Sequence, residues 1–86
     1  MTIDFSLSFD RHFAKLSKAQ KQLVKDALEL FSEDPFHDTL RNHPLTGQWA
    51  RYRSISADSD LRLHYQSISA EVVLFVAVGS HGQLYK

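Results

Sequence analysis

The hydrophobic positions change their period within the first third of the chain. Phe5, Leu7 and Phe9 are separated by serines, and this alternation predicts a half-buried strand. After them the spacing becomes that of a helix, with hydrophobic positions at Phe13, Leu16, Leu23, Val24, Ala27, Leu28 and Phe31. Ser17 is a suitable N-cap, and Pro35 disfavours helix at the residue before it. We expect a strand, a short helix over about 10–16 and a long helix that ends before the proline, the two helices forming a hairpin.

The rest of the chain is read as a loop followed by strands. Residues 33–48 hold both prolines and one of the three glycines, which predicts a loop. Three strand-like runs follow, at about 50–57, 60–67 and 71–78, and the breaks between them are short enough for hairpins. The order β-α-α-β-β-β predicts an α+β fold, in which two N-terminal helices pack on one face of a small antiparallel sheet.

The third run is apolar on both faces, as expected of a central strand. The chain after Gly79 should therefore leave the middle of the sheet, where a rigid strand can present side chains to solvent. His81 is suited to proton transfer, Tyr85 to stacking on a nucleobase and Lys86 to phosphate contact. On residue type alone, these are equally the residues of an ordinary tail.

Length and composition narrow the class of protein. A chain of 86 residues fits one domain, over 1–86, and 43% hydrophobic residues is a globular composition. The absence of cysteine excludes disulfides, thiolate chemistry and cysteine-based zinc sites. The longest apolar run, from Val72 to Val78, is far shorter than the roughly 20 residues of a membrane span, and the N-terminus lacks the pattern of a signal peptide. We expect a soluble cytoplasmic protein that makes no membrane contact.

The charge of the chain gives limited support to a nucleic-acid partner. Ten Lys and Arg balance ten Asp and Glu, so the formal net charge is zero with histidines neutral. Residues 41–86 are mildly basic and also contain His43, His64 and His81. A basic face is consistent with this distribution, whereas a strong electrostatic footprint is not.

Three arginines could form a phosphate-binding group. Arg51 and Arg53 are two positions apart and would share a strand face, with Arg62 on the neighbouring strand. Guanidinium groups suit bidentate binding of phosphate. A solvated face, or pairing with Asp58 and Asp60, explains the same pattern equally well.

The other candidate side chains fit more than one interpretation. His64 shares a strand face with Arg62, but a half-buried histidine with satisfied hydrogen bonds is the simpler interpretation. His43, held extended by the proline after it, is either a site residue or a loop residue, and Trp49 either stacks on a ligand or packs at the rim of the core. His12 and His37 have no companions at metal-ligand spacing, and no glycine-rich nucleotide loop or serine-hydrolase elbow occurs. We therefore predict no metal and no cofactor.

Three segments together resemble the RelE/YafQ-type toxins of bacterial toxin–antitoxin pairs. They are HPLTG at 43–47, RYRSISADSDLRLHYQ at 51–66 and VGSHGQLY at 78–85. Within the second, Asp60, Arg62 and Tyr65 match an aspartate and an R-x-x-Y pattern of the family's middle strand. The resemblance covers nearly the whole chain, and the element order expected above is also that of the family.

The resemblance implies a ribosome-dependent endoribonuclease that cuts mRNA without a metal and is inhibited by an antitoxin in a hetero-oligomer. By position, His81 is implied as the leading proton-transfer residue and Arg62 as the ligand of the scissile phosphate. His43 and Asp60 would assist proton transfer and orientation, and Tyr85 would stack or donate a hydrogen bond. Arg53 would be a further phosphate contact.

The chain departs from the YafQ pattern at three positions, and two other functions stay open. Ser56, Leu61 and Ala77 stand where that branch usually has histidine, tryptophan and arginine. One alternative is a ParE-like inhibitor that binds a protein such as DNA gyrase without catalysis, although the His-x-x-x-Tyr ending favours the nuclease. The other is a degenerate member that retains only antitoxin binding.

Overall fold

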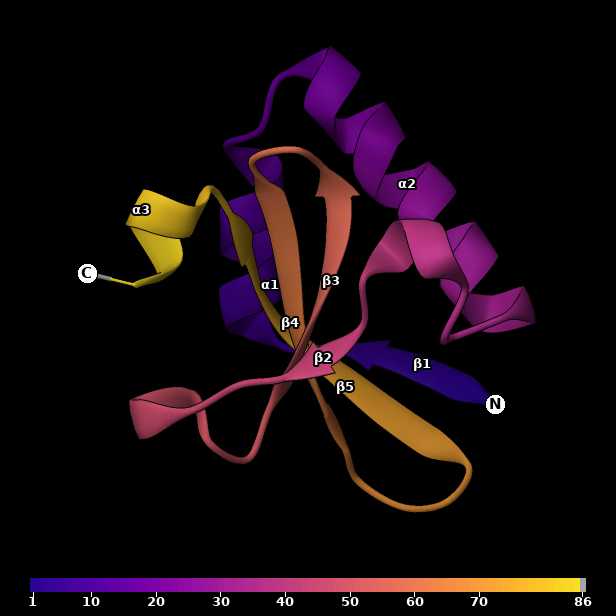
Figure 1. Ribbon diagram of the computed structural model, residues 1–86. Coiled ribbons are helices and arrows are strands. Elements are labelled where there is room, and N and C mark those ends of the chain that lie inside the picture. Colours follow the sequence, from indigo (N-terminus) through magenta and orange to yellow (C-terminus); the bar gives the residue numbers. More distant parts are fainter. Residues whose placement is uncertain (86) are drawn as a thin grey trace.

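A five-stranded sheet with two main helices forms the body of the protein (Figure 1). The computed structural model describes residues 1–85. The sheet order is β1-β5-β4-β3-β2. In chain order the elements are β1 (Thr2–Phe5), α1 (Leu7–Ala14), α2 (Lys18–Glu33), the 3₁₀ helix η1 (Asp38–Leu40), β2 (His43–Pro44), the 3₁₀ helix η2 (Gly47–Trp49), β3 (Arg53–Asp58), β4 (Leu61–Ser67), β5 (Val72–Gly79) and α3 (His81–Leu84).

The predicted α+β fold class is confirmed, with one difference in strand pairing. β5 lies between β1 and β4, so the apolar third run is an interior strand as expected. β1 pairs with β5 in parallel, whereas the other three pairings are antiparallel. The sheet is therefore mixed rather than wholly antiparallel, because the first strand takes the edge beside the last one.

The first strand is shorter than the alternation of hydrophobic residues predicted. Ser6 ends β1 and caps α1, since its side chain accepts a hydrogen bond from the backbone N–H of Phe9. The prediction that Leu7 and Phe9 belong to a strand is therefore wrong: Phe9 enters the core from a helix, and Leu7 remains exposed. The short helix covers 7–14 instead of 10–16.

The long helix follows the prediction closely. Ser17 caps α2 in a reciprocal capping box with Gln20, and the helix ends at Glu33, two residues before Pro35. Its buried residues are Val24, Ala27 and Phe31, which lie on one face.

The hydrophobic core lies between these helices and one face of the sheet. Phe31 packs edge-on against Tyr65 and Phe75, with ring centroids 4.9 and 5.2 Å apart. Ile55 and Leu63 complete the sheet side of the core and are fully buried. Because side chains alternate along a strand, the residues next to Ile55 and Leu63 point to the opposite face.

The region predicted as a loop contains short elements of its own, namely η1, β2 and η2. A last short helix, α3, follows β5 and was not predicted. Ser80 and Gln83 form a capping box at its start. Within residues 1–85, no helix is both long and apolar enough to cross a membrane.

Candidate functional site

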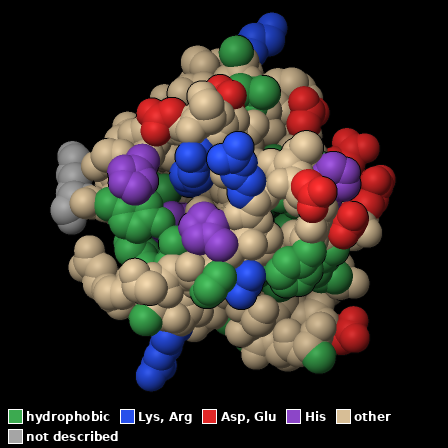
Figure 2. All heavy atoms as spheres, viewed as in Figure 1, with side chains coloured by type: hydrophobic (Ala, Val, Ile, Leu, Met, Phe, Trp, Pro, Cys, Tyr) green, Lys and Arg blue, Asp and Glu red, His purple; other side chains and the backbone are tan. Residues whose placement is uncertain are grey.

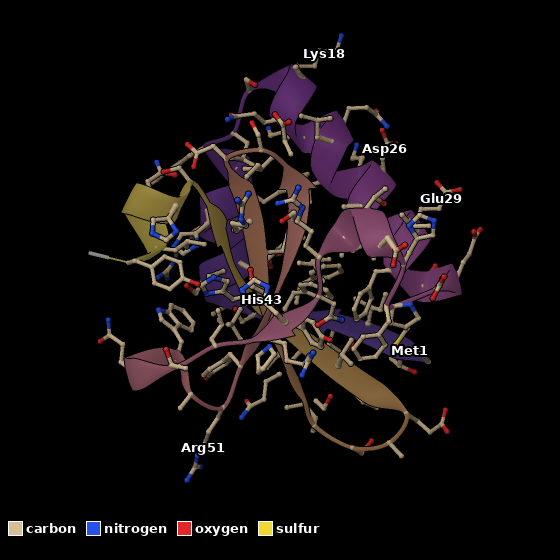
Figure 3. The ribbon with its side chains drawn as sticks, in the orientation of Figure 1. Met1, Lys18, Asp26, Glu29, His43 and Arg51 are labelled. Atoms are coloured by element: carbon tan, nitrogen blue, oxygen red, sulfur yellow. The ribbon has the colours of Figure 1, made fainter. Side chains whose placement is uncertain are left out.

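The sheet face opposite the helices carries a row of polar side chains. His43 on β2 pairs with Ser54 on β3, which in turn pairs with His64 on β4 and, through it, with Ala77 on β5. Directly opposite residues on paired strands share a face. The three strands β2, β3 and β4 thus place two histidines on one face of the sheet, and Figure 3 shows His43 over the middle of the sheet.

The next row on this face contains Arg62. It pairs with Ser56 on β3 and with Gly79 on β5. One of its terminal nitrogens donates a hydrogen bond to the backbone carbonyl of Asp58 at 2.8 Å, which holds the guanidinium beside the β3–β4 turn. The two residues of the R-x-x-Y pattern therefore lie on opposite faces of the sheet: Arg62 on this face, and Tyr65 in the core.

The helix α3 brings the C-terminal histidine and tyrosine onto the same face. The Tyr85 hydroxyl lies 3.2 Å from His64 Nε2, and the Tyr85 ring centroid lies 4.5 Å from that of His81. The indole N–H of Trp49 donates to the Leu84 carbonyl at 3.2 Å, which fixes α3 against η2. The resemblance placed His81 and Tyr85 in one site, and the structure brings them into contact.

Asp60 contacts His81 through the backbone. Its Oδ1 accepts a hydrogen bond from the His81 N–H at 3.3 Å. The carboxylate thus links the β3–β4 turn to the first residue of α3. This contact fixes the backbone at the start of α3.

His43 is oriented by the residue two positions before it. Its Nδ1 lies 2.8 Å from the Arg41 carbonyl, and a carbonyl only accepts hydrogen bonds, so Nδ1 carries the proton. In the neutral ring, Nε2 is then left with a free lone pair. Arg41 itself adopts the left-handed conformation, with φ 51°, which is uncommon for a residue with a side chain.

His64 is wholly buried, at 0% exposure, which differs from the half-buried and satisfied histidine expected. Its ring stands edge-on to Trp49 at 4.4 Å. Burial, and to a lesser degree the charges of His43 and His81, lower its pKa from 6.5 to about 4, so it is neutral at pH 7. Its Nδ1 and the Ser54 hydroxyl are both buried without a hydrogen-bond partner.

The phenol of Tyr85 stays protonated at neutral pH. Partial burial raises its pKa, and the positive charge of Arg62 opposes this rise without cancelling it. Tyr85 can therefore act as a hydrogen-bond donor beside the histidines.

The predicted grouping of three arginines is wrong. Arg53 lies on the helix side of the sheet, where its Nε donates to Asn42 Oδ1 at 2.7 Å and its guanidinium covers the Phe36 ring at 5.3 Å. Arg51 lies in the exposed turn before β3 and points away from the sheet (Figure 3). Only Arg62 of the three reaches the open face.

Arg41, rather than Arg51 or Arg53, lies beside Arg62. It lines an open pocket of about 380 Å³ together with Arg62, Ser56, Asp58 and Ser59. Figure 2 shows basic side chains gathered beside histidines over this part of the surface. No local pattern in the sequence points to Arg41, because only the fold of residues 38–44 brings it toward the β3–β4 hairpin.

The remaining candidates have structural surroundings or lie outside the description. His12 Nδ1 accepts a hydrogen bond from the Val78 N–H, and His37 caps η1. Trp49 covers His64 at the rim of the site, and Lys86 lies outside the described residues. Within residues 1–85, no three His, Cys, Asp or Glu side chains are grouped so that they could hold a metal ion.

The whole chain matches one known protein family. Residues 1–86 match the family model of the YafQ bacterial toxins of type II toxin–antitoxin systems. The chain belongs to the YafQ toxin family. The predicted resemblance to RelE/YafQ-type toxins is thereby confirmed, and the protein is a toxin of a type II system. A comparison with curated proteins gives no significant match.

Solved structures of YafQ and related toxins share this fold. The crystal structure of YafQ from E. coli strain BL21(DE3) matches with a TM-score of 0.80 and 22% identity, covering 98% of this chain and 97% of that one. YafQ in the E. coli DinJ–YafQ toxin–antitoxin complex matches with a TM-score of 0.77 and 24% identity, covering 98% and 96%. A metal-bound toxin from Helicobacter pylori matches with a TM-score of 0.75 and 25% identity, covering 99% of each chain.

Proposed function

We propose that this YafQ-family toxin is a ribosome-dependent endoribonuclease that cleaves mRNA without a metal ion. The observation that carries the proposal is that His43, Arg62, His81 and Tyr85 lie on one face of the sheet, opposite α1 and α2, with His81 and Tyr85 in contact. Proton-transfer groups and a guanidinium on one open surface are what cleavage of a phosphodiester by its own 2′-hydroxyl requires.

In this reaction the ribose 2′-oxygen attacks the adjacent phosphorus, and the bond from phosphorus to the 5′-oxygen breaks. A 2′,3′-cyclic phosphate and a free 5′-hydroxyl result. The base must remove the 2′-proton, and the acid must give a proton to the leaving oxygen. His43 fits the base, because the Arg41 carbonyl leaves its Nε2 free, and His81 fits the acid, because Asp60 fixes the start of its helix.

The arginines and the phenol would stabilise the negative charge that develops on the phosphorane. Arg62, with Arg41 across the same pocket, can bind non-bridging oxygens of the scissile or neighbouring phosphate. Tyr85 is protonated and can donate a hydrogen bond or stack on a base. Arg51 and Arg53, which point elsewhere, have no part in this scheme.

The partners follow from the same proposal. The toxin would act on mRNA held in the ribosome, and a cognate antitoxin would inhibit it in a toxin–antitoxin hetero-oligomer. The complex of the relative YafQ with DinJ supports the second partner. An antitoxin that covers the open face would block access to the histidines and to the Arg41–Arg62 pocket together.

Induction of the toxin without an antitoxin, followed by mapping of mRNA 5′ ends, tests the proposal. We expect cuts in the reading frame that disappear when translation is blocked. His81→Ala should lower cleavage by roughly 10²- to 10⁴-fold, the usual effect of removing a general acid or base. His37→Ala, at the exposed histidine that precedes η1, is the matched control and should cleave like the wild type.

Two results would contradict the nuclease. Growth arrest accompanied by DNA-damage signalling, with the mRNA left intact, would favour a ParE-like inhibitor. Normal growth on induction would favour a member that only binds its antitoxin, as the replacements at Ser56, Leu61 and Ala77 allow.

A further inference from the structure

His64 is the imidazole of this face to which the proposed reaction gives no role. It lies on β4 under Trp49 and Tyr85, between the exposed His43 and His81, and no part of it reaches solvent. It cannot touch RNA. Any effect of His64 on cleavage must therefore pass through a neighbour.

The neighbour that it holds is Tyr85. His64 Nε2 and the Tyr85 hydroxyl are 3.2 Å apart, and the rings meet at an angle of 61° with centroids 5.3 Å apart. On its other side, the Tyr85 ring lies 4.5 Å from His81. His64, Tyr85 and His81 thus form a continuous series of contacts from the buried strand to the exposed proton-transfer group.

The surroundings of His64 do not suit a purely structural residue. Its Nδ1 is buried without a partner, as is the hydroxyl of Ser54, the residue directly opposite on β3. Buried polar atoms without partners are costly, and an apolar side chain of similar size would avoid this cost. Such local penalties are typical of sites where function outweighs stability.

We propose that His64 is a positioning residue, whose Nε2 fixes the Tyr85 hydroxyl and, through the Tyr85 ring, sets the orientation of His81 toward the scissile phosphate. This inference rests on the proposed nuclease function. The lowered pKa of His64 fits it, because a neutral imidazole has one donor and one acceptor nitrogen, and only the neutral ring avoids repulsion of a positive charge on His81. The Tyr85 hydroxyl has one proton and two lone pairs, so after bonding to His64 it keeps capacity to bond RNA.

A double-mutant cycle tests the role in catalysis. Single-turnover cleavage of ribosome-bound mRNA is measured for the wild type, His64→Leu, Tyr85→Phe and the double variant. We expect each single change to lower the rate about 10- to 100-fold with KM little altered, the scale on which misplacing a reacting group slows catalysis. The double variant should be no slower than the more impaired single one. Effects that multiply, or a wild-type rate in His64→Leu, would overturn the inference.

A pair of amide variants separates the two ring nitrogens. In His64→Gln the amide can reach the position of Nε2, so a large part of the rate should return. In His64→Asn the amide corresponds to Nδ1, and the rate should stay as low as in the leucine variant. Equal rates in the two amide variants would show that the contact to Tyr85 does not matter.

Stability and NMR measurements distinguish this inference from the failure of the nuclease itself. A positioning role predicts that His64→Leu unfolds at the same or a higher urea concentration, whereas a structural role predicts a clear loss. The imidazole ¹⁵N shifts of His64 should change in Tyr85→Phe, whether or not the protein cuts mRNA. Unchanged shifts would refute the contact. If the shifts change in Tyr85→Phe but the wild type does not cleave mRNA, the contact is real and the proposed function is overturned. The catalytic role of His64 falls with it.

Discussion

The buried imidazole of His64 should make the toxin sensitive to acid. Burial and the charges of His43 and His81 lower its pKa to about 4 in the folded protein, against 6.5 in the unfolded chain. The unfolded state therefore binds a proton first as the pH falls. The stability contributed by the neutral ring is complete above about pH 6.5, declines between 6.5 and 4, and is lost below.

The expected loss is large for so small a domain. A tenfold difference in proton affinity is worth about 1.4 kcal/mol, so the two pKa values correspond to ~3 kcal/mol. Domains are commonly stable by only about 5–15 kcal/mol, so acid would remove a considerable part of the free energy of unfolding. His64→Leu has no proton to gain at this position.

Urea unfolding at several pH values between 7 and 4 measures the effect. The free energy of unfolding of the wild type should fall by ~3 kcal/mol more than that of His64→Leu over this range, because all other titrating groups contribute to both. His37→Leu, at an exposed histidine, is the matched control: loss of the η1 cap changes its stability at every pH, but its curve should run parallel to that of the wild type. Parallel curves for the wild type and His64→Leu would refute the reasoning, since they would mean that His64 titrates alike in both states.

Three further changes probe other parts of the structure. Gly79→Ala would place a methyl group 2.8 Å from Gln83 Oε1, the atom that accepts a hydrogen bond from the Ser80 N–H, so we expect a loss of about 1 kcal/mol in stability and slower cleavage. Gln83→Ala should reproduce both effects in the same assays. Phe31→Ala removes a fully buried ring and should cost roughly 3–5 kcal/mol in urea unfolding, while a loss below 1 kcal/mol would contradict the described core. Arg41→Ala should weaken binding of a single-stranded RNA oligonucleotide and reduce the slope of log affinity against log salt by about 0.7, and an unchanged slope would remove Arg41 from the RNA surface.

Local patterns in the sequence were sufficient for much of the fold. The helical period and the cap at Ser17 gave α2 to within a residue of its observed start, because both signals act within a few neighbouring residues. The apolar run after Glu71 identified β5 as an interior strand, since only a strand covered on both faces has no polar alternation. The three family segments led to the YafQ toxins, although none of them is specific alone.

Other features needed the register of the sheet. Arg53 and Arg62 lie on opposite faces because Arg53 pairs with Tyr65, whereas Arg62 pairs with Ser56. A shift of one residue in the β3–β4 pairing would put both arginines on the same face, and the turn between the strands has no residue pair that dictates its type. The sequence could therefore list the arginines but could not say which of them share a surface.

Contacts between distant segments decided the rest of the site. The short serine-capped helix α1 replaced an expected strand because the Ser6 side chain satisfies the N–H of Phe9 and the helix buries that ring. Burial of His64 depends on Trp49 and Tyr85, which come from separate elements, and the approach of Arg41 depends on a left-handed backbone. Sequence alone thus determined the long helix and the three strands of the C-terminal half, because hydrophobic periods and caps are local. Tertiary structure determined which side chains meet, because pairing register and long-range packing are not.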